Sequence, residues 1–400
     1  MVPTPDRSSL VATPAHPDIL CLSHLRWDFV YQRPQHLLTR FARRQRVFYV
    51  EEPIADAAAS YAEISRDPSG VFVVVPHVPC DLDAIARDRE MRTLVDNVVQ
   101  SHQLTTFVLW YYTPMALAFT SHLRPAAVVY DCMDELSAFA GAPAGLVAAE
   151  RTLMAKADVM LTGGQSLYEA KRHLHPNIHA VPSSVDAAFF GLARRPQPEP
   201  ADQAAVPSPR IGFFGVLDER LDIPLLAASA AARPDWHFIL VGPVAKIDPA
   251  TLPTGANLHY LGPKSYESLP SYIAGWDVAV LPFARNDATR FISPTKTPEY
   301  LAAGRPVVST SIRDVVRPYG ETGLAAIADT PDGFVAAIAA ALVTHGPEAT
   351  AAADRFLSRT SWDATWARVD RLVSAVLPVA SEADVPTRRP CLTPMAAART

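Results

Sequence analysis

The sequence is poor in lysine and in cysteine, and it has little net charge. Five lysines stand against 31 arginines in 400 residues, and the formal net charge is −5. Without an overall basic field, nucleic acid is a poor candidate for the partner. The cysteines are scattered, without a C-x-x-C pair or the spacing of metal ligands, which is typical of a reducing cytosol. They are Cys21, Cys80, Cys132 and Cys391.

The sequence also lacks long hydrophobic runs. Its first ten residues do not contain the apolar stretch of a signal peptide. No apolar run reaches the roughly 18 residues that a transmembrane helix needs. We therefore expect a cytoplasmic protein. A hydrophobic fraction of 49% and a charged fraction of 19% are those of a globular chain, and 400 residues suffice for two domains.

Short apolar runs alternate with helical stretches in both halves of the chain. Continuous apolar strands separated by helices are typical of a parallel sheet covered on both faces. The expected strands are 18–23, 46–50, 71–75, 106–110, 126–130, 159–162 and 178–181, then 211–214, 237–241, 258–261, 278–281, 307–310 and 325–327. This pattern predicts an α/β protein with two doubly wound, Rossmann-like parallel-sheet domains.

A proline-rich polar stretch separates the two halves and predicts a semi-rigid linker over 192–209. The first domain is then expected over 18–191 and the second over 210–355. An amphipathic helix follows, with Ser361 as its cap, within 356–378. We expect the ends, 1–17 and 379–400, to be disordered.

One stretch carries most of the functional information: S-P-T-K-T-P-E-Y-L-A-A-G-R-P-V-V, residues 293–308. It predicts a short helix with Thr295 as its N-cap and Pro298 in its first turn, ended by Gly304 and followed by a buried strand. The first turn of a helix offers free N–H groups and partial positive charge, and Lys296 stands there.

Lys296 and Glu299 together suit a nucleoside diphosphate. A cation beside free amides suits the diphosphate, and a carboxylate one turn later suits ribose hydroxyls. The alternative is an ordinary capped helix with two solvated charges. The scarcity of lysine favours function, because two of the five, Lys264 and Lys296, fall at expected strand-to-helix connections.

The motif S-P-x-K-x-x-E-Y-L-A-A-G-x-P-V-V resembles the donor-site segment of GT-B-fold glycosyltransferases of the family 1/4 type, which build bacterial surface and exopolysaccharides. The resemblance extends more weakly over residues 18 to about 377. It implies an acceptor domain and a donor domain that face each other across a cleft, with the last helix crossing back to the first domain. Many retaining members carry two glutamates eight positions apart. Glu299 matches the second, but Phe291 occupies the position of the first, so a retaining or an inverting outcome stays open.

The other donor-side candidates follow the expected strands of the second domain, where ligands of doubly wound sheets bind. Gly215 permits close approach of a ligand, while Arg220 and Lys264 offer cations. The loop after the fourth strand offers short polar groups for sugar or phosphate oxygens. The donor-binding candidates are Gly215, Arg220, Lys264, Asn286, Thr289, Thr295, Lys296 and Glu299. A tight turn, solvated lysines and an ordinary surface loop are the structural alternatives.

In the first domain, Asp131, Asp134 and Glu135 end an expected strand. A carboxylate at the cleft can deprotonate an acceptor hydroxyl, and we expect Asp134 to be this catalytic group, with Asp287 as the next candidate. Helix capping by Asp134 is the structural alternative.

The loop after the first strand carries aromatic and planar donor groups suited to a sugar acceptor. The acceptor-binding candidates are His24, Trp27, Arg33 and Gln35. The basic helix that follows could rest on the inner face of the cytoplasmic membrane, although a solvated face explains it as well.

The function expected from these features is transfer of a sugar from a nucleotide diphosphate-sugar, with UDP the commoner choice in similar enzymes, to a saccharide or lipid-linked acceptor in bacterial polysaccharide biosynthesis. The sequence has no evident D-x-D motif, so we expect no required metal and no cofactor besides the co-substrate. A sugar-nucleotide epimerase of the same fold and a non-catalytic nucleotide-sugar-binding scaffold are the alternatives.

Overall fold

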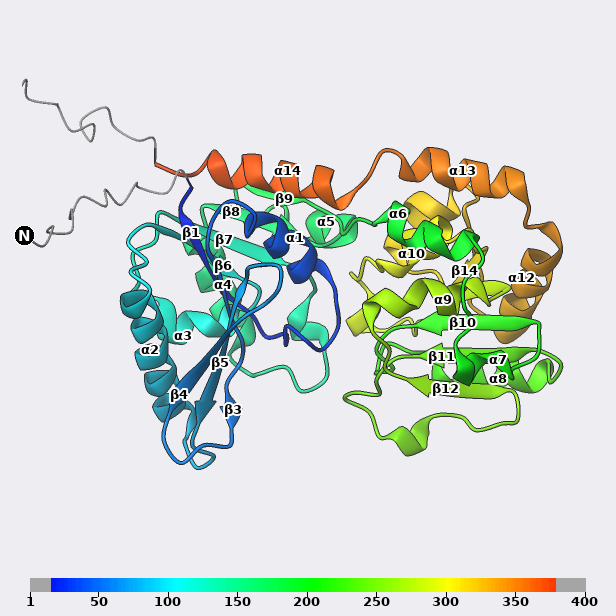
Figure 1. Ribbon diagram of the computed structural model, residues 1–400, viewed down its shortest axis with the longest axis horizontal. Coiled ribbons are helices and arrows are strands. Elements are labelled where there is room, and N and C mark those ends of the chain that lie inside the picture. The colour runs from blue at the N-terminus through cyan, green and yellow to red at the C-terminus, as the bar shows by residue number, and fades with distance from the viewer. Residues whose placement is uncertain (1–15, 379–400) are drawn as a thin grey trace, which may run out of the picture.

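The computed structural model describes residues 16–378, which form two α/β halves, each with its own sheet (Figure 1). This confirms the predicted fold class. The predictions of disorder at the two ends, and Cys391, fall largely or wholly outside the described residues. Cys21 and Cys132 are buried free cysteines, and Cys80 is an exposed one.

The first half is a sheet of nine described strands in the order β3-β5-β2-β1-β6-β7-β8-β9, with β4 paired to β5. Its strands are β1 (Asp18–Leu22), β2 (Val47–Val50), β3 (Ile54–Ala55), β4 (Tyr61–Arg66), β5 (Phe72–Val78), β6 (Phe107–Tyr111), β7 (Ala127–Cys132), β8 (Val159–Thr162) and β9 (Ile178–Ala180). The sequence did not reveal β3 and β4. β4 runs antiparallel to β5 and is mostly exposed, so it lacks the apolar run that marks a buried strand.

The helices of the first half are α1 (Arg33–Phe41), α2 (Ala84–Ser101), α3 (Leu117–Thr120), α4 (Leu146–Lys156) and α5 (Gln165–Lys171). Leu37, Leu38 and Phe41 on α1 join one core cluster on the sheet, and Val95 and Val98 on α2 join another. Two core clusters for one sheet are what burial of both faces predicts.

The second half is a sheet of six described strands, all parallel, in the order β12-β11-β10-β13-β14-β15. They are β10 (Arg210–Phe214), β11 (His237–Val241), β12 (Leu258–Gly262), β13 (Val278–Leu281), β14 (Val307–Ser309) and β15 (Ala325–Ile327). Its helices are α8 (Ile223–Ala232), α9 (Leu269–Ala274), α10 (Lys296–Ala302), α11 (Arg313–Val315), α12 (Pro331–Thr344) and α13 (Pro347–Leu357). The strand order reverses between β10 and β13, and a crevice forms at the carboxyl ends of strands where this happens.

The segment expected as a semi-rigid linker, 192–209, packs on the second half. It contains α7 (Ala201–Ala204) and follows α6 (Ala187–Phe190). Phe190 and Val206 lie in the core of the second half. The fully buried Gln203 donates to the carbonyl of Tyr272 at 3.0 Å and accepts from Nε1 of Trp276 at 2.9 Å. The proline content concealed these anchoring side chains.

The last described helix, α14 (Trp362–Ser374), leaves the second half and lies along the first (Figure 1). Trp362, Val369 and Val373 join the core of the first half. Arginines on and just after α1 pair with the acids of α14: Arg40 of α1 reaches Asp363 at 2.6 Å, and Arg44, three residues beyond α1, contacts Asp370.

These ion pairs leave two of the basic side chains expected at a membrane, Arg40 and Arg44, in contact with a helix of the same chain. Among the described helices, none by itself has the length and apolarity to cross a membrane. Two consecutive helical segments meet those two criteria when they are taken together, although the chain bends by 103° between them. They are Pro331–Thr344 and Pro347–Ser374.

Candidate active site

A cavity of about 1070 Å³ lies between the two halves, at the carboxyl ends of their strands. It is lined by ten of the residues singled out from the sequence: His24, Trp27, Gln35, Asp134, Gly215, Arg220, Lys264, Thr295, Lys296 and Glu299. The other four, Arg33, Asn286, Asp287 and Thr289, lie outside its lining. Its size suits a nucleotide-sugar, since ligand cavities measure roughly 300–1,000 Å³.

The helix α10 presents its N-terminus to this cavity. Thr295 is the N-cap residue, although its side chain makes no capping hydrogen bond to the described chain. Pro298 lies in the first turn, where a missing N–H is harmless. After the helix, Gly304 adopts a φ of +70°. The Tyr300 hydroxyl accepts a hydrogen bond from the amide of Phe214 at 2.9 Å, and this bond fixes α10 to the end of β10.

Lys296 lies against the backbone at Gly215. Gly215 has a φ of +143°, a conformation that favours glycine, and a Cβ there would lie 2.2 Å from Cε of Lys296. The Lys296 ammonium is 5.7 Å from the centre of the Phe214 ring. Burial lowers the pKa of Lys296, whereas the neighbouring Glu299 raises it. The ammonium is therefore held where counter-charge from a ligand would favour its charged form.

Glu299 is a buried carboxylate with an unused acceptor. Its side chain is 5% exposed, and Oε2 has no hydrogen-bond partner among the described residues. Burial raises the pKa of Glu299 to about 7, while Lys296 and the Thr295 hydroxyl lower it. Because an unpaired buried carboxylate oxygen is costly, this atom is suited to accept hydrogen bonds from a ligand.

Arg220 follows β10 and is held in place by Asp218. Its Nε lies 2.9 Å from Oδ1 and its Nη2 2.7 Å from Oδ2. Lys246, which follows β11 and has a φ of +62°, also lines the cavity. The Phe139 ring of the first half lies near both cations, with its centre 5.8 Å from the Arg220 guanidinium and 5.3 Å from the Lys246 ammonium.

Lys246 and Asp218 were not predicted from the sequence. The feature that singled out Lys264, a rare lysine just after a strand, would also have singled out Lys246. Lys264 lies at the cavity but is already paired, with Nζ 2.7 Å from Oδ2 of Asp202.

Asp134 follows β7 of the first half and faces the cations of the second half. Burial raises the pKa of Asp134, while Arg220, Lys246 and Lys296 lower it. The sequence could not reveal this, because the first half and the second half meet only in the folded chain.

The acids on either side of Asp134 are engaged elsewhere. Asp131 is fully buried and pairs with Arg33, and Glu135 pairs with Lys171 at 2.7 Å.

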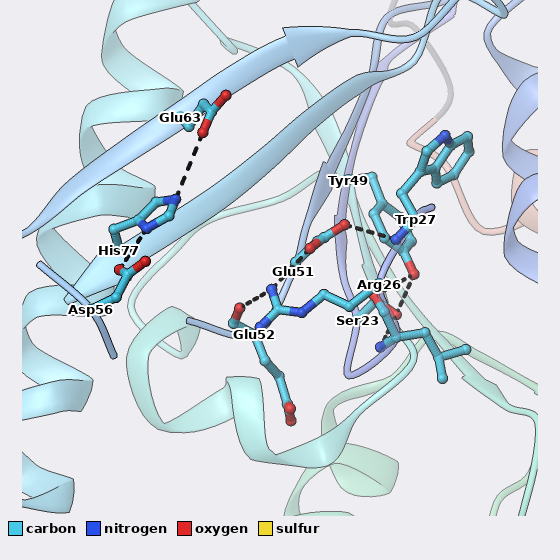
Figure 2. Close-up of polar contacts among 10 residues, drawn as sticks. Ser23, Arg26, Trp27, Tyr49, Glu51, Glu52, Asp56, Glu63 and His77 are labelled. Carbon is cyan, nitrogen blue, oxygen red and sulfur yellow. Dashed lines mark hydrogen bonds and ion pairs between the residues drawn. The ribbon is translucent and has the colours of Figure 1, made fainter. Parts of the chain in front are cut away.

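The loop on the first-half side of the cavity is held by a hydrogen-bond network (Figure 2). Glu51 accepts from the amide of Trp27 at 2.7 Å and from Arg26 at 2.9 Å. Gln35 Nε2 donates to the carbonyl of Trp27 at 2.5 Å. Trp27 and Gln35 therefore shape the loop as well as line the cavity.

His24 lies at the end of the first strand and also lines the cavity. Burial lowers the pKa of His24 to about 4, with Lys246 acting in the same direction. The imidazole is therefore neutral at pH 7, and as a neutral ring it can donate one hydrogen bond and accept another.

Arg33 and the loop after β13 have structural partners. The Arg33 guanidinium is 2% exposed, bonds both oxygens of Asp131 at 3.0 Å through Nε, and donates to the carbonyl of Val181 at 2.7 Å. Asn286 and Thr289 form a reciprocal capping box around a turn over 287–289. Asp287 is exposed on that turn. Polar residues that satisfy the local backbone are expected in loops of this type, so composition alone did not distinguish them from ligand-binding groups.

Within residues 16–378, no group of three or more His, Cys, Asp or Glu side chains is arranged to hold a metal ion. The cations that line the cavity are the protein's own, from Arg220, Lys246, Lys264 and Lys296.

Comparisons with known proteins agree with this architecture. Residues 208–343 match the family described as "Glycosyl transferases group 1". The chain is 26% identical over 281 residues to the "Putative teichuronic acid biosynthesis glycosyltransferase TuaH" of Bacillus subtilis (strain 168), covering 65% of this chain and 70% of that protein.

Solved structures with the same fold include sucrose-phosphate synthase from Thermosynechococcus elongatus, with a TM-score of 0.66 and 13% identity over 90% of this chain and 99% of that one. HepE of Anabaena, in complex with UDP and glucose, has a TM-score of 0.62 and 16% identity over 90% of this chain and 100% of that one.

The position of Arg33 predicts a structural effect. Replacing Arg33 with Met leaves Asp131 buried without its counter-charge, so we expect the free energy of unfolding to fall by about 3–5 kcal/mol. Arg43→Met, on the exposed side of the chain just after α1, should change it by less than about 0.5 kcal/mol. Urea unfolding measures both. Equal stability of the two variants would contradict a structural role for Arg33.

The environment of Glu299 predicts a pH dependence. Its folded pKa, about 7, lies above its ordinary value of 4.5, so between these values the folded protein keeps a proton that the unfolded chain has lost. Stability then falls as pH rises from about 4.5 to 7. Glu299→Gln removes this pH-dependent loss of stability. The melting temperature of the variant should therefore rise relative to that of the wild type between pH 5 and pH 8. A difference between the two melting temperatures that stays constant across this range would show that the pKa of Glu299 is not raised in the folded protein.

Proposed function

We propose that this chain, a group 1 glycosyltransferase with the GT-B fold, transfers a sugar from a UDP-sugar to a saccharide or lipid-linked acceptor in the synthesis of a bacterial cell-surface polysaccharide. The name of the Bacillus relative supports the polysaccharide class, and the UDP complex of HepE supports the nucleotide.

One observation carries the donor assignment: Lys296, in the first turn of α10, lies along Gly215 at the end of β10. Free amides and an ammonium at one helix N-terminus bind a diphosphate. The Glu299 oxygen that lacks a partner in the described chain then accepts hydrogen bonds from the ribose hydroxyls.

In the proposed reaction, an acceptor hydroxyl oxygen forms a bond to the anomeric carbon while the bond from that carbon to the diphosphate oxygen breaks. UDP leaves with the bonding electrons. Lys296 and Arg220 stabilise the charge that develops on the leaving diphosphate, without a required metal.

The role of Asp134 depends on the stereochemical outcome. With inversion, Asp134 takes the proton of the acceptor hydroxyl, and a pKa raised by burial makes it a stronger base than an exposed carboxylate. With retention, the departing diphosphate oxygen takes the proton of the acceptor hydroxyl, and Asp134 orients the donor sugar.

Phe291 favours a second candidate, a binding protein without transfer activity. This residue occupies the position of the first glutamate of the resembling family and packs against the core of the first half. Hydrolysis or transfer from a panel of UDP-sugars separates the two, since a scaffold binds UDP without turnover. Interconversion of the sugar without an acceptor would indicate an epimerase instead.

Lys296→Ala tests the diphosphate site. Loss of a partly buried charged hydrogen bond, worth roughly 1.5–3 kcal/mol, should weaken UDP binding about 10- to 150-fold. Uridine, which lacks the diphosphate, should bind as before. Lys264→Ala should weaken UDP binding less, because that lysine is already paired with Asp202. Calorimetry that finds unchanged UDP affinity for Lys296→Ala would rule out a direct phosphate contact.

Asp134→Asn tests the catalytic carboxylate. Loss of a general base costs about 10²- to 10⁴-fold in rate, so turnover at saturating donor should fall by that factor if the enzyme inverts, and by less if it retains. Asp287→Asn is the matched control, since Asp287 is exposed outside the cavity lining. Circular dichroism checks the fold. Near-normal turnover of the Asp134 variant would refute the assignment.

A further inference from the structure

A short helix of the first half, α5, connects the second half to the strand end that carries Asp134. Its N-terminus meets α11 of the second half, and its last residue, Lys171, reaches Glu135. Both connections are made by charged side chains that are less than a tenth exposed, Asp314 at 7% and Lys171 at 5%.

Asp314 caps α5 from across the boundary between the halves. The N-cap residue of α5 is Gly164, which has no side chain of its own for capping. Instead, Oδ1 of Asp314 accepts a hydrogen bond from the amide of Ser166 at 2.9 Å. A Cβ at Gly164 would lie 2.3 Å from Oδ2 of Asp314, so a glycine at this position leaves room for the carboxylate from the second half. Because the cap belongs to the other half, it exists only while the halves are in contact.

At the other end of α5, Lys171 fixes the residue that follows Asp134. Its Nζ lies 2.7 Å from Oε2 of Glu135, and 2.8 and 2.9 Å from the two oxygens of Glu150. Glu150 lies on α4 and is buried, so it anchors the lysine. The Asp134 backbone is then held on both sides, by Glu135 through Lys171 and by Asp131 through Arg33.

The segment is also packed against the start of α5. A Cβ at Gly163 would lie 2.3 Å from the carbonyl oxygen of Met133, so the two backbones are in direct contact. A displacement of α5 would therefore move the residues on both sides of Asp134.

We propose that Asp314 and Lys171 are positioning residues, which act through α5 to hold Asp134 in place when the two halves are closed on each other. This inference rests on the proposed role of Asp134. Neither residue touches the substrates: Asp314 supplies the cap that orders the start of α5, and Lys171 transmits the position of its end to Glu135.

The test compares hydrogen exchange and turnover in the full-length chain. The variants are Asp314→Ala and the double variant Glu150→Gln/Lys171→Met, in which the uncharged pair avoids a buried unpaired carboxylate at Glu150. Amides in a peptide covering 131–137 should exchange about fivefold faster in Asp314→Ala, the factor that corresponds to loss of a helix cap. A similar increase is expected in the double variant, which loses the contact from position 171 to Glu135. Turnover should fall about 10- to 100-fold because of the misplaced carboxylate, while the affinity for UDP stays unchanged by calorimetry.

Two controls separate positioning from general loss of structure. Arg313→Ala/Arg317→Ala removes the ion pairs to Glu169, which also lies on α5 and is reached at 3.0 Å by partly exposed arginines. Because exposed ion pairs contribute little, exchange and turnover should stay near those of the wild type. Lys171→Arg keeps the charge and should retain most of the turnover that the methionine variant loses.

Unchanged exchange over 131–137 in either test variant would overturn the proposal, as would faster exchange with normal turnover. If the wild-type protein transfers no sugar to any acceptor, the proposed function fails and the catalytic part of this inference fails with it. The exchange comparison would then still decide whether α5 holds the segment.

Discussion

Lys296 lies in the space that a side chain at position 215 would fill, and the second-half side of the cavity depends on this close approach. The lysine fits only because Gly215 has no Cβ. Position 242 must also be glycine, because a Cβ there would lie 1.9 Å from the carbonyl oxygen of Gly215. The bond from the Phe214 amide to the Tyr300 hydroxyl then holds the helix at this distance. The close contact between a strand end and a helix start brings the amides, the ammonium and the Glu299 carboxylate to one place.

The scarcity of lysine proved informative because each lysine has an identifiable environment. Lys246, Lys264 and Lys296 line the cavity, and Lys156 is exposed at the end of α4. Lys171 pairs with the buried Glu150 and the partly buried Glu135. Many arginines, by contrast, serve the fold, as Arg33 does through Asp131 and Arg40 does through Asp363. A planar guanidinium suits such fixed multiple hydrogen bonds, whereas the lysine ammonium acts as a compact point charge.

Short-range sequence patterns predicted the secondary-structure elements whose signals lie within one stretch of the chain. The parallel strands and the helix from Lys296 to Ala302 were evident, because apolar runs, a cap residue and a terminal glycine all lie in one stretch. β4 was not, since its side chains are mostly exposed. Arg33 was assigned to the acceptor because its partners, Asp131 and Val181, are about 100 and 150 residues away in the chain. The burial of such a group is decided by tertiary contacts that no short window contains.

The electrostatics of the cavity suggest an order for the proposed reaction. Three cations of the second half, Arg220, Lys246 and Lys296, lower the pKa of Asp134 and so oppose the effect of its burial. A diphosphate bound among these cations would cancel their charge and add negative charge of its own near Asp134. The pKa of Asp134 would then rise, because its ionised form loses the cations that favour it. If the proposed transfer inverts, Asp134 therefore becomes a stronger base once the donor is bound, which favours removal of the acceptor proton after the sugar is in place.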